Sequence, residues 1–205
     1  MNDKILQHAD INAQVNLRPR ERIVLTAREM FYHHGIRSVG IEAITEAAGT
    51  NKMTLYRHFG SKDDLIVECI QKAVAEGCNF WDELEGKYPG DPKAQLAAWV
   101  QNCAERLGSD ERGCEMANAA VELAEEDHPA RRVIEDAKKR FRGRLAELCE
   151  RAGLEQPRMV ADMLGLLLEG AKISRQSEGA EGPSARFKRM ADEIIATVGG
   201  QGDKA

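Results

Sequence analysis

The 205-residue sequence contains no apolar run that approaches the roughly 18 residues needed to span a bilayer. Residues 1–17 also lack the basic and apolar segments of a secretory signal, since Ile5, Leu6 and Ile11 stand isolated among polar neighbours. No segment shows the alternation of apolar and polar residues that is typical of a half-buried strand. We therefore expect an all-helical, cytoplasmic protein with no membrane partner.

Cysteine is scarce, and its five positions never form the C-x-x-C spacing of zinc and redox sites. These positions are Cys69, Cys78, Cys103, Cys114 and Cys149. We expect reduced thiols inside the core, because free cysteine is among the most buried residue types. A redox-sensing role for one of them stays open, since reactivity depends on accessibility and local charge.

The sequence also lacks the motifs of common catalytic and cofactor sites: it has no P-loop, no dinucleotide fingerprint and no G-x-S-x-G. A single Glu-x-x-His runs from Glu125 to His128, but a diiron bundle needs two such motifs. We interpret it as a solvated acidic patch at a helix junction. The expected protein is not an enzyme and has no cofactor and no metal site.

The formal net charge of −5 is unevenly distributed. Residues 1–64 carry nine Lys and Arg against eight Asp and Glu, which gives +1, and the remaining 20 against 26 give −6. The basic residues of the first region cluster at Arg18 to Arg22 and at Lys52 to Lys62, where contacts with phosphates would need them. The acidic total therefore does not argue against nucleic-acid binding.

Apolar residues recur three or four positions apart through almost the whole chain, which predicts about nine helices. The expected helices span residues 19–34, 41–48, 52–58, 61–84, 92–107, 113–125, 129–153, 157–173 and 184–198. Residues with capping preferences mark several ends, among them Gly35, Ser61 with Asp64, and Asp91 before Pro92. Residues 157–173 are apolar around most of the helix circumference, which implies that a partner subunit covers part of it.

Residues 41–59 have the build of a helix-turn-helix, in which two short helices flank Gly49-Thr50-Asn51. Such short helices are not stable alone and must pack on the preceding one. Their expected inner face consists of Ile44, Ala47, Ala48, Leu55 and Phe59. The outer face of the second helix, which would enter the major groove, consists of Lys52, Met53, Thr54, Tyr56, Arg57 and His58.

At these positions the sequence strongly resembles the TetR family of bacterial regulators. The resemblance rests on Ile23, Ala27, Phe31, Gly35, Ile44, Ala47, Gly49, Thr54, Leu55, Tyr56, Phe59, Ser61, Lys62 and Leu65. A later stretch with Gly113-Cys114, Asn118, Glu122 and His128-Pro129 looks like one branch of the family. The resemblance implies a flexible extension over 1–17, a three-helix DNA-binding domain over 18–64, a larger helical domain for ligand binding and dimerisation over 65–199, and a disordered tail over 200–205.

The resemblance also implies the roles of individual residues in contact with double-stranded operator DNA. Tyr56 and Lys62 would contact phosphates, and Lys52, Met53 and Thr54 would reach base edges. Arg57 and His58 are assigned to the DNA backbone, and Thr45 completes the predicted set of DNA contacts.

Two departures from the family pattern bear on this assignment. Gly40 stands where the family usually has Ser or Thr, so that a cap or phosphate contact is either lost or shifted to Ser38. The turn reads Thr50-Asn51 where the family usually has Val-Ser, which alters the groups available to phosphates at the start of the second helix.

Large residues on separate helices of the second domain fill its core or, as the resemblance suggests, line a cavity for an unknown small-molecule effector. The candidates are Trp81, Trp99, Met116, Phe141 and Met163, joined by Asn118 as a polar anchor. The resemblance places a homodimer interface on the last two helices, at about 157–173 and 184–198.

The sequence therefore predicts a homodimeric transcriptional repressor that a small molecule releases from a palindromic operator. An activator or a ligand-independent regulator is the alternative within DNA binding. A protein of another class, a helical interaction module that has lost DNA binding, is favoured by the two departures and by the small charge of the first region.

Overall fold

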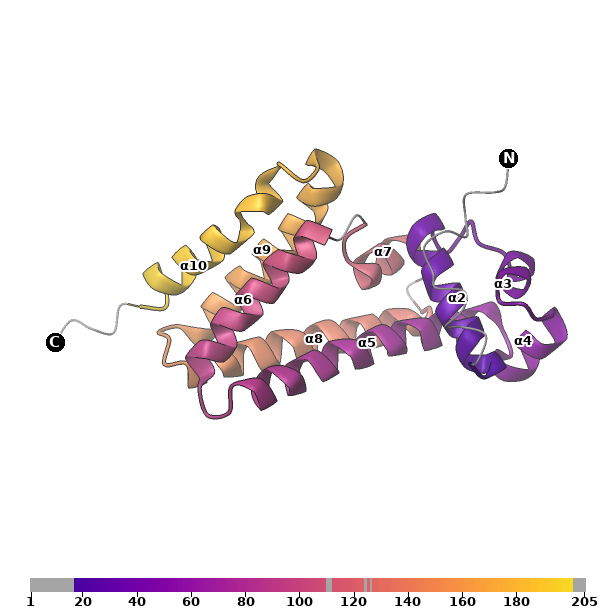
Figure 1. Cartoon of the computed structure of the whole chain (residues 1–205), viewed down its shortest axis with the longest axis horizontal. Helices are drawn as coiled ribbons and strands as arrows, with labels where there is room; N and C mark the ends of the chain where they lie inside the picture. The colour runs from indigo at the N-terminus through magenta and orange to yellow at the C-terminus, as the bar shows by residue number, and fades with distance from the viewer. Residues whose placement is uncertain (1–16, 110–111, 124, 126, 201–205) are drawn as a thin grey trace. The chain divides into compact units, whose positions relative to one another are not determined.

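The computed structural model describes residues 17–109, 112–123, 125 and 127–200, and within these ranges the chain is helical with no strand (Figure 1). Its described helices are α2 (Pro19–His34), α3 (Ile41–Ala47), α4 (Lys52–Phe59), α5 (Lys62–Lys87), α6 (Pro92–Ser109), α7 (Glu115–Glu122), α8 (Pro129–Arg151), α9 (Pro157–Glu178), the 3-10 turn η1 (Pro183–Arg186) and α10 (Phe187–Thr197). The all-helical class and the nine α-helices expected from the sequence are confirmed for this part of the chain.

Several helix ends form as the sequence predicts, because side chains satisfy the backbone groups that a helix end leaves unpaired. The Ser61 hydroxyl accepts the Asp64 backbone N–H at 3.0 Å, and the Asp91 carboxylate accepts the Ala94 N–H at 3.0 Å. Gly35 ends α2 with a φ of 84°, a conformation that is unfavourable for other residues. These caps fix the first turns of α5 and α6 and the end of α2.

The end of α9 differs from the sequence-based expectation, which ended this helix at residue 173. The helix continues to Glu178, because its polar side chains bond along it and to a neighbouring helix. The Ser177 hydroxyl donates to the Ile173 carbonyl at 3.1 Å, and the Arg175 Nε donates to the Leu107 carbonyl of α6 at 3.3 Å. Composition alone did not reveal these bonds.

The chain divides between Cys69 and Ile70 into two compact units. In the first unit, α2, α3 and α4 pack around a common apolar core. Its buried side chains are Ile23, Ala27, Phe31, Ile36, Ile44, Leu55, Phe59 and Leu65. The sequence-based division at 64/65 falls five residues before that of the structure, and the expected extension and tail lie, except for Leu17 and Gly200, outside the described residues.

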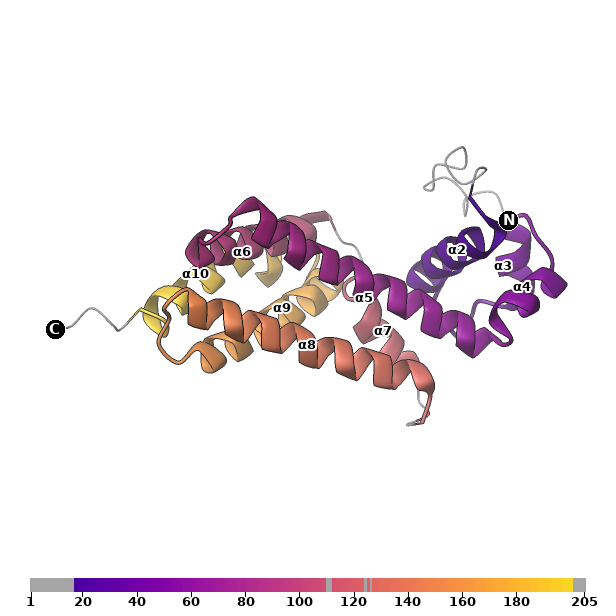
Figure 2. The ribbon, with the colours of Figure 1, turned by 90° about the horizontal axis from the view of Figure 1, so that it is seen from below.

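The second unit consists of the rest of α5 together with α6 to α10 (Figure 2). The helices α6, α8, α9 and α10 share one core, in which Trp99, Leu145, Leu164 and Phe187 are almost completely buried. Two ion pairs join α5 to α8, Asp82 with Arg144 at 2.9 Å and Glu85 with Arg151 at 3.2 Å. None of the described helices combines the length and hydropathy that a membrane span requires.

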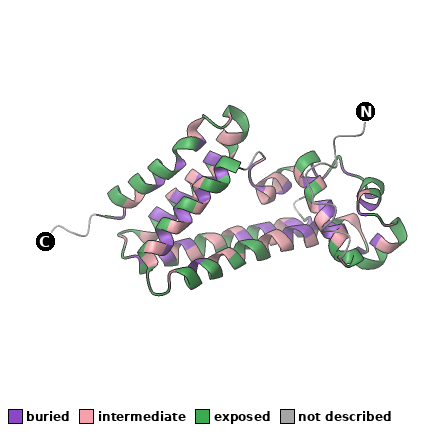
Figure 3. Ribbon diagram, in the orientation of Figure 1, coloured by how far each residue is buried: buried purple, intermediate pink, exposed green. Residues whose placement is uncertain are grey.

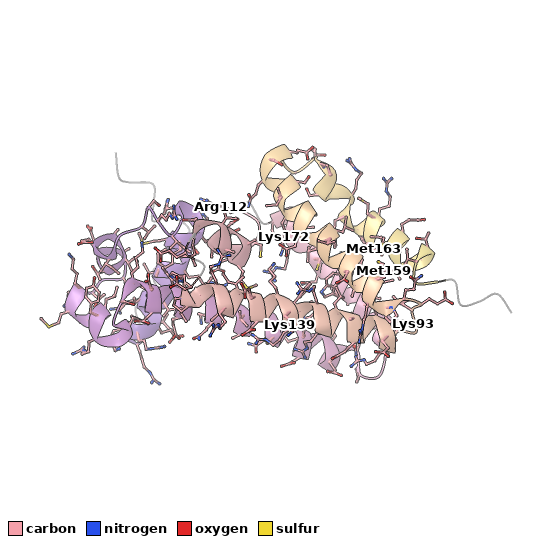
Figure 4. All side chains as sticks on the ribbon, turned by 180° about the vertical axis from the view of Figure 1, so that it is seen from behind. Lys93, Arg112, Lys139, Met159, Met163 and Lys172 are labelled. Carbon is pink, nitrogen blue, oxygen red and sulfur yellow. The ribbon has the colours of Figure 1, made fainter. Side chains whose placement is uncertain are left out.

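Apolar side chains on α9 and α10 are left uncovered in the single chain. Figure 3 shows exposed positions along both helices, and Figure 4 labels Met159 on α9. The uncovered apolar side chains are Met159 at 53%, Leu166 at 75%, Ile173 at 56% and Met190 at 42%. The opposite face of α9 is buried, with Val160, Leu164 and Leu168 in the core. Both faces of α9 are thus apolar, as the sequence pattern indicates.

The buried cysteines generate a prediction about thiol reactivity. Burial raises the pKa of the Cys103 thiol to about 12 and that of Cys149 to about 11. At pH 8 a thiol with a pKa near 12 is a thiolate in about one molecule in ten thousand, so we expect iodoacetamide to modify the half-buried Cys78 first. Peptide mass spectrometry after timed alkylation checks the order. Rapid modification of Cys103 or Cys149 without denaturant would contradict it, and alkylation in urea is the control.

Candidate DNA-binding site and second-unit cavity

The outer face of α4 presents side chains that suit contacts with DNA. Lys52, Met53, Tyr56, Arg57 and His58 are exposed, with Met53 at 81% and Tyr56 at 46%. The opposite face of α4 is fixed by Leu55 and Phe59 in the core. Packing of one face therefore orients the other toward solvent, which is the arrangement that major-groove recognition requires.

The turn before α4 contains Asn51, one of the two turn residues that depart from the usual family pattern. Its side-chain oxygen accepts the Thr54 backbone N–H at 2.9 Å and so caps the helix. Thr54 is itself half-buried, and Gly49 holds a φ of 59° in the turn. Asparagine thus does the capping work that serine would do at this position, and the change leaves the turn intact.

The start of α3, where Gly40 departs from the family pattern, has no side-chain cap. Gly40 occupies the capping position, and the Ser38 hydroxyl donates instead to the Gly35 carbonyl at 3.2 Å and to the carbonyl of His34. The cap is therefore lost and not shifted to Ser38. Thr45 on the same helix is 5% exposed, and its hydroxyl donates to the Glu42 carbonyl at 3.0 Å.

Basic residues that the sequence pattern assigned to phosphates hold the unit together. The Arg22 Nε donates to the Ala48 carbonyl at 2.6 Å, which ties α2 to the turn of the helix-turn-helix. The Arg20 guanidinium lies 5.4 Å from the centre of the Phe59 ring and pairs with Glu68 at 2.8 Å. Sequence reasoning missed these roles because a cluster of arginines does not reveal its partners.

Lys62, a predicted phosphate contact, also bonds within the first unit. Its Nζ donates to the Ile36 carbonyl at 2.7 Å and lies 5.8 Å from the centre of the Phe31 ring. It thereby connects the start of α5 to the segment after α2. The Ile36 carbonyl takes one of the three donors of the ammonium.

An exposed ion pair connects the two helices of the motif. Lys52, at the start of α4, pairs with the carboxylate of Glu42 on α3. The hydrogen bond and charge of Lys52 lower the pKa of Glu42, and those of Glu42 raise the pKa of Lys52. A predicted base contact is thus partly neutralised by an acid of the same protein, which the sequence-based interpretation did not anticipate.

This ion pair predicts that Glu42→Gln strengthens DNA binding. Releasing Lys52 adds one cation for phosphates or bases, so the log-log salt slope should steepen by up to about one and affinity should rise severalfold. Fluorescence anisotropy at several salt concentrations measures both quantities.

Glu46→Gln is the matched control, because Glu46 is exposed on the same helix. This substitution also removes one negative charge, but it leaves the Glu42 carboxylate that pairs with Lys52. An equal gain from both variants would mean that only net charge matters. Weaker binding by Glu42→Gln would mean that the carboxylate orients Lys52 productively.

A cavity of about 380 Å³ lies in the second unit, between residues of α5, α7, α8 and α9. Three of the six candidate ligand residues line it: Trp81, Met116 and Phe141. The other three do not line it. Trp99 lies in the core with its ring centre 6.2 Å from that of Phe141, the Asn118 side chain donates to the Arg112 carbonyl at 2.8 Å, and Met163 lies on α9 (Figure 4).

Charged side chains form one wall of the cavity, and none of them was among the ligand residues predicted from the sequence. The Lys138 Nζ pairs with Glu169 at 2.5 Å and lies 3.6 Å from the Cys114 sulfur, and Lys172 lies 3.9 Å from the same carboxylate. Burial alone would lower the pKa of Lys138, but the neighbouring Cys114 and Glu169 outweigh it and raise that pKa. The lysines were missed because they are separated in sequence by 34 positions and lie on different helices.

The side chains of the described residues form no cluster of three or more His, Cys, Asp and Glu that could hold a metal ion. What the residues do form is a capped recognition helix with an exposed polar face in one unit and a partly charged cavity in the other. This arrangement defines a helix-turn-helix unit joined to a helical unit that contains a cavity.

Comparisons with known proteins agree with this class. Residues 23–69 match the family described as bacterial regulatory proteins, tetR family. The crystal structure of a TetR-family transcriptional regulator from Streptomyces coelicolor is similar with a TM-score of 0.81 and 29% identity, over 88% of this chain and 95% of that one. The chain is thus similar to the TetR family of bacterial transcriptional regulators in its helix-turn-helix and in its fold.

Two curated relatives show how far the likeness in sequence extends. The transcriptional activator FasR of Mycolicibacterium smegmatis is 33% identical over 67 residues, which are 31% of each chain. The transcriptional repressor KstR2 of Rhodococcus jostii is 30% identical over 94 residues, which are 43% of each chain. The matched stretch thus spans less than half of these curated relatives.

Proposed function

We propose that the chain is a homodimeric, cytoplasmic repressor that binds a palindromic operator and leaves it when a small molecule enters the cavity of the second unit. The observation that carries the proposal is the combination of an exposed polar face on α4 with a cavity whose wall includes α5. A recognition surface and a ligand-sized cavity are the two sites that a ligand-controlled regulator needs.

Most of the proposed contacts with DNA are exposed side chains of α4. Lys52, Met53 and Thr54 lie on its first turn and are assigned to base edges. Tyr56 and Lys62 are assigned to phosphates, which fix the position of the protein on the duplex. The remaining assignments are Arg57 and His58 to the DNA backbone, with Thr45 contributing least because its hydroxyl is buried and already bonded.

The proposed dimer buries the apolar face of α9 and α10. Met159, Leu166, Ile173 and Met190 on these helices would otherwise stay in water at a cost of about 25 cal/mol per Å² of apolar surface. Two copies related by a twofold axis would place two recognition helices on two half-sites, which is why the operator is expected to be palindromic.

The proposed switch works through α5. This helix begins at Lys62 in the DNA-binding unit and contributes Val74 and Trp81 to the cavity wall in the second unit. A ligand that binds better to a conformation with a shifted α5 would favour that conformation, typically with about 1–3 kcal/mol of coupling. The second candidate is an activator, since an activator and a repressor both occur among the relatives.

The DNA-binding proposal predicts that Tyr56→Phe weakens operator binding by about fivefold to tenfold, because a hydrogen bond to a charged phosphate is lost. The measurement is fluorescence anisotropy with the DNA upstream of the gene, at near-physiological salt and with scrambled competitor. Tyr88→Phe in the second unit is the matched control, and it should bind as the parent does.

Binding that survives the competitor would support an operator upstream of the gene. Sequence-blind binding that Tyr56→Phe leaves unchanged would contradict the proposal and favour the helical interaction module.

The ligand proposal predicts that Gly77→Leu makes the operator complex less sensitive to effectors. Gly77 lines the cavity on α5, and a Cβ at this position meets no atom within 4 Å, so the substitution introduces no clash at its first side-chain atom. Compounds that release operator DNA from the parent should need about tenfold higher concentrations with this variant.

Gly86→Leu is the control, because Gly86 is also on α5 with open space around its Cβ but does not line the cavity. Unchanged release from Gly77→Leu would exclude the cavity as the effector site. Absence of release by any compound that occupies the cavity would favour the ligand-independent regulator.

A further inference from the structure

The charges on the cavity wall do not cancel. Lys138 and Lys172 both approach a single carboxylate, that of Glu169, at 2.5 and 3.9 Å. The side chains of the two lysines are only 25% and 23% exposed. Among the described residues, Glu169 is the acid within ion-pair distance of either amine, so the wall carries one surplus positive charge.

The other charged residues of the lining do not remove this surplus. Arg144 pairs with Asp82 at 2.9 Å, which neutralises it. Arg140 and Glu147 are exposed on α8 and offset each other in formal charge. The surplus therefore stays with Lys138 and Lys172, in a setting where an incompletely paired charge is costly.

The remaining lining is mainly apolar. Val74, Trp81, Met116, Phe141 and Leu168 form it, and a cavity of about 380 Å³ lies within the range of small-molecule sites. A ligand that fills this space buries an apolar body against the rings and places its polar end at the lysines.

We propose that the cavity binds an amphipathic monoanion, a molecule with a compact aromatic or branched apolar body and one carboxylate or sulfonate group that contacts Lys138 and Lys172. This proposal rests on the assignment of the cavity as the effector site. The anion completes the neutralisation that Glu169 begins, and charge-assisted hydrogen bonds from two ammonium groups orient it.

Aromatic rings can also bind organic cations, but the geometry does not favour a cationic ligand. The guanidinium of Arg144 lies 5.7 Å from the centre of the Trp81 ring and already occupies a position over that ring. The surplus charge of Lys138 and Lys172 would repel a second cation in the same space.

Two fluorescent probes with nearly the same body but different charge test the proposal on the full chain. 8-Anilinonaphthalene-1-sulfonate is a monoanion, and N-phenyl-1-naphthylamine has the same aromatic skeleton without the sulfonate. Fluorescence titration gives a Kd for each probe, and energy transfer from tryptophan reports proximity to Trp81 and Trp99. We expect the anion to bind about tenfold more tightly than the neutral probe.

Two substitutions should change this preference in opposite directions. Lys172→Gln leaves Lys138 and Glu169 as a neutral pair and should weaken binding of the anion about tenfold, with the neutral probe unchanged. Glu169→Gln raises the surplus by one charge and should tighten binding of the anion severalfold. Lys188→Gln is the matched control, because Lys188 lies on α10, pairs with Asp192 and does not line the cavity.

The proposal is overturned if the two probes bind equally, if the neutral probe binds more tightly, or if Lys172→Gln leaves the anion unaffected. It is also overturned if Gly77→Leu, which narrows the cavity, leaves the anion preference intact, since the probe then binds elsewhere. Operator binding in the same samples separates this proposal from the proposed function. Release of DNA by neutral compounds alone would refute only the anion class, and anion binding that never affects DNA would refute only the effector role.

Discussion

The helix-turn-helix depends on the packing of α2 against two helices that are too short to be stable alone. The helix α3 has seven residues and α4 has eight, well below the length at which isolated helices persist in water. Burial of Ile23, Ala27 and Phe31 on α2 supplies the apolar contacts that both need. The exposed face of α4 thus exists only because a third helix lies behind it, and every proposed DNA contact on α4 depends on that packing.

Much of this architecture could be predicted from the sequence, because the signals are local. The 3.6-residue apolar period predicted the helices, and Ser61, Asp91 and Gly35 predicted helix ends that the structure confirms. The exposed face of α4 follows from the burial of Leu55 and Phe59, which are four positions apart. At the end of α9 a polar stretch interrupts the apolar period, and the predicted helix therefore ended too early.

What could not be predicted concerns partners that are distant in sequence. The Glu42 carboxylate that holds Lys52, and the Glu169 carboxylate that Lys138 and Lys172 share, become neighbours only when helices pack. Residue size suggested the ring-bearing side of the cavity, Trp81 and Phe141, but gave no indication of its charged side. The side chains of an amphipathic helix do not reveal which other helix they will face. The chemistry of the cavity depends on which helices face one another.

The bonds that hold the helix-turn-helix in place run largely to the main chain. Arg22 binds the carbonyls of Ala48 and Gly49, Asn51 binds the amide of Thr54, and Lys62 binds the carbonyl of Ile36. Main-chain groups are the same whatever residue bears them, so these bonds do not constrain the outward side chains. The scaffold is therefore insensitive to the identity of residues such as Met53 and Arg57, and the outward surface of this helix can be exchanged while its frame stays unchanged.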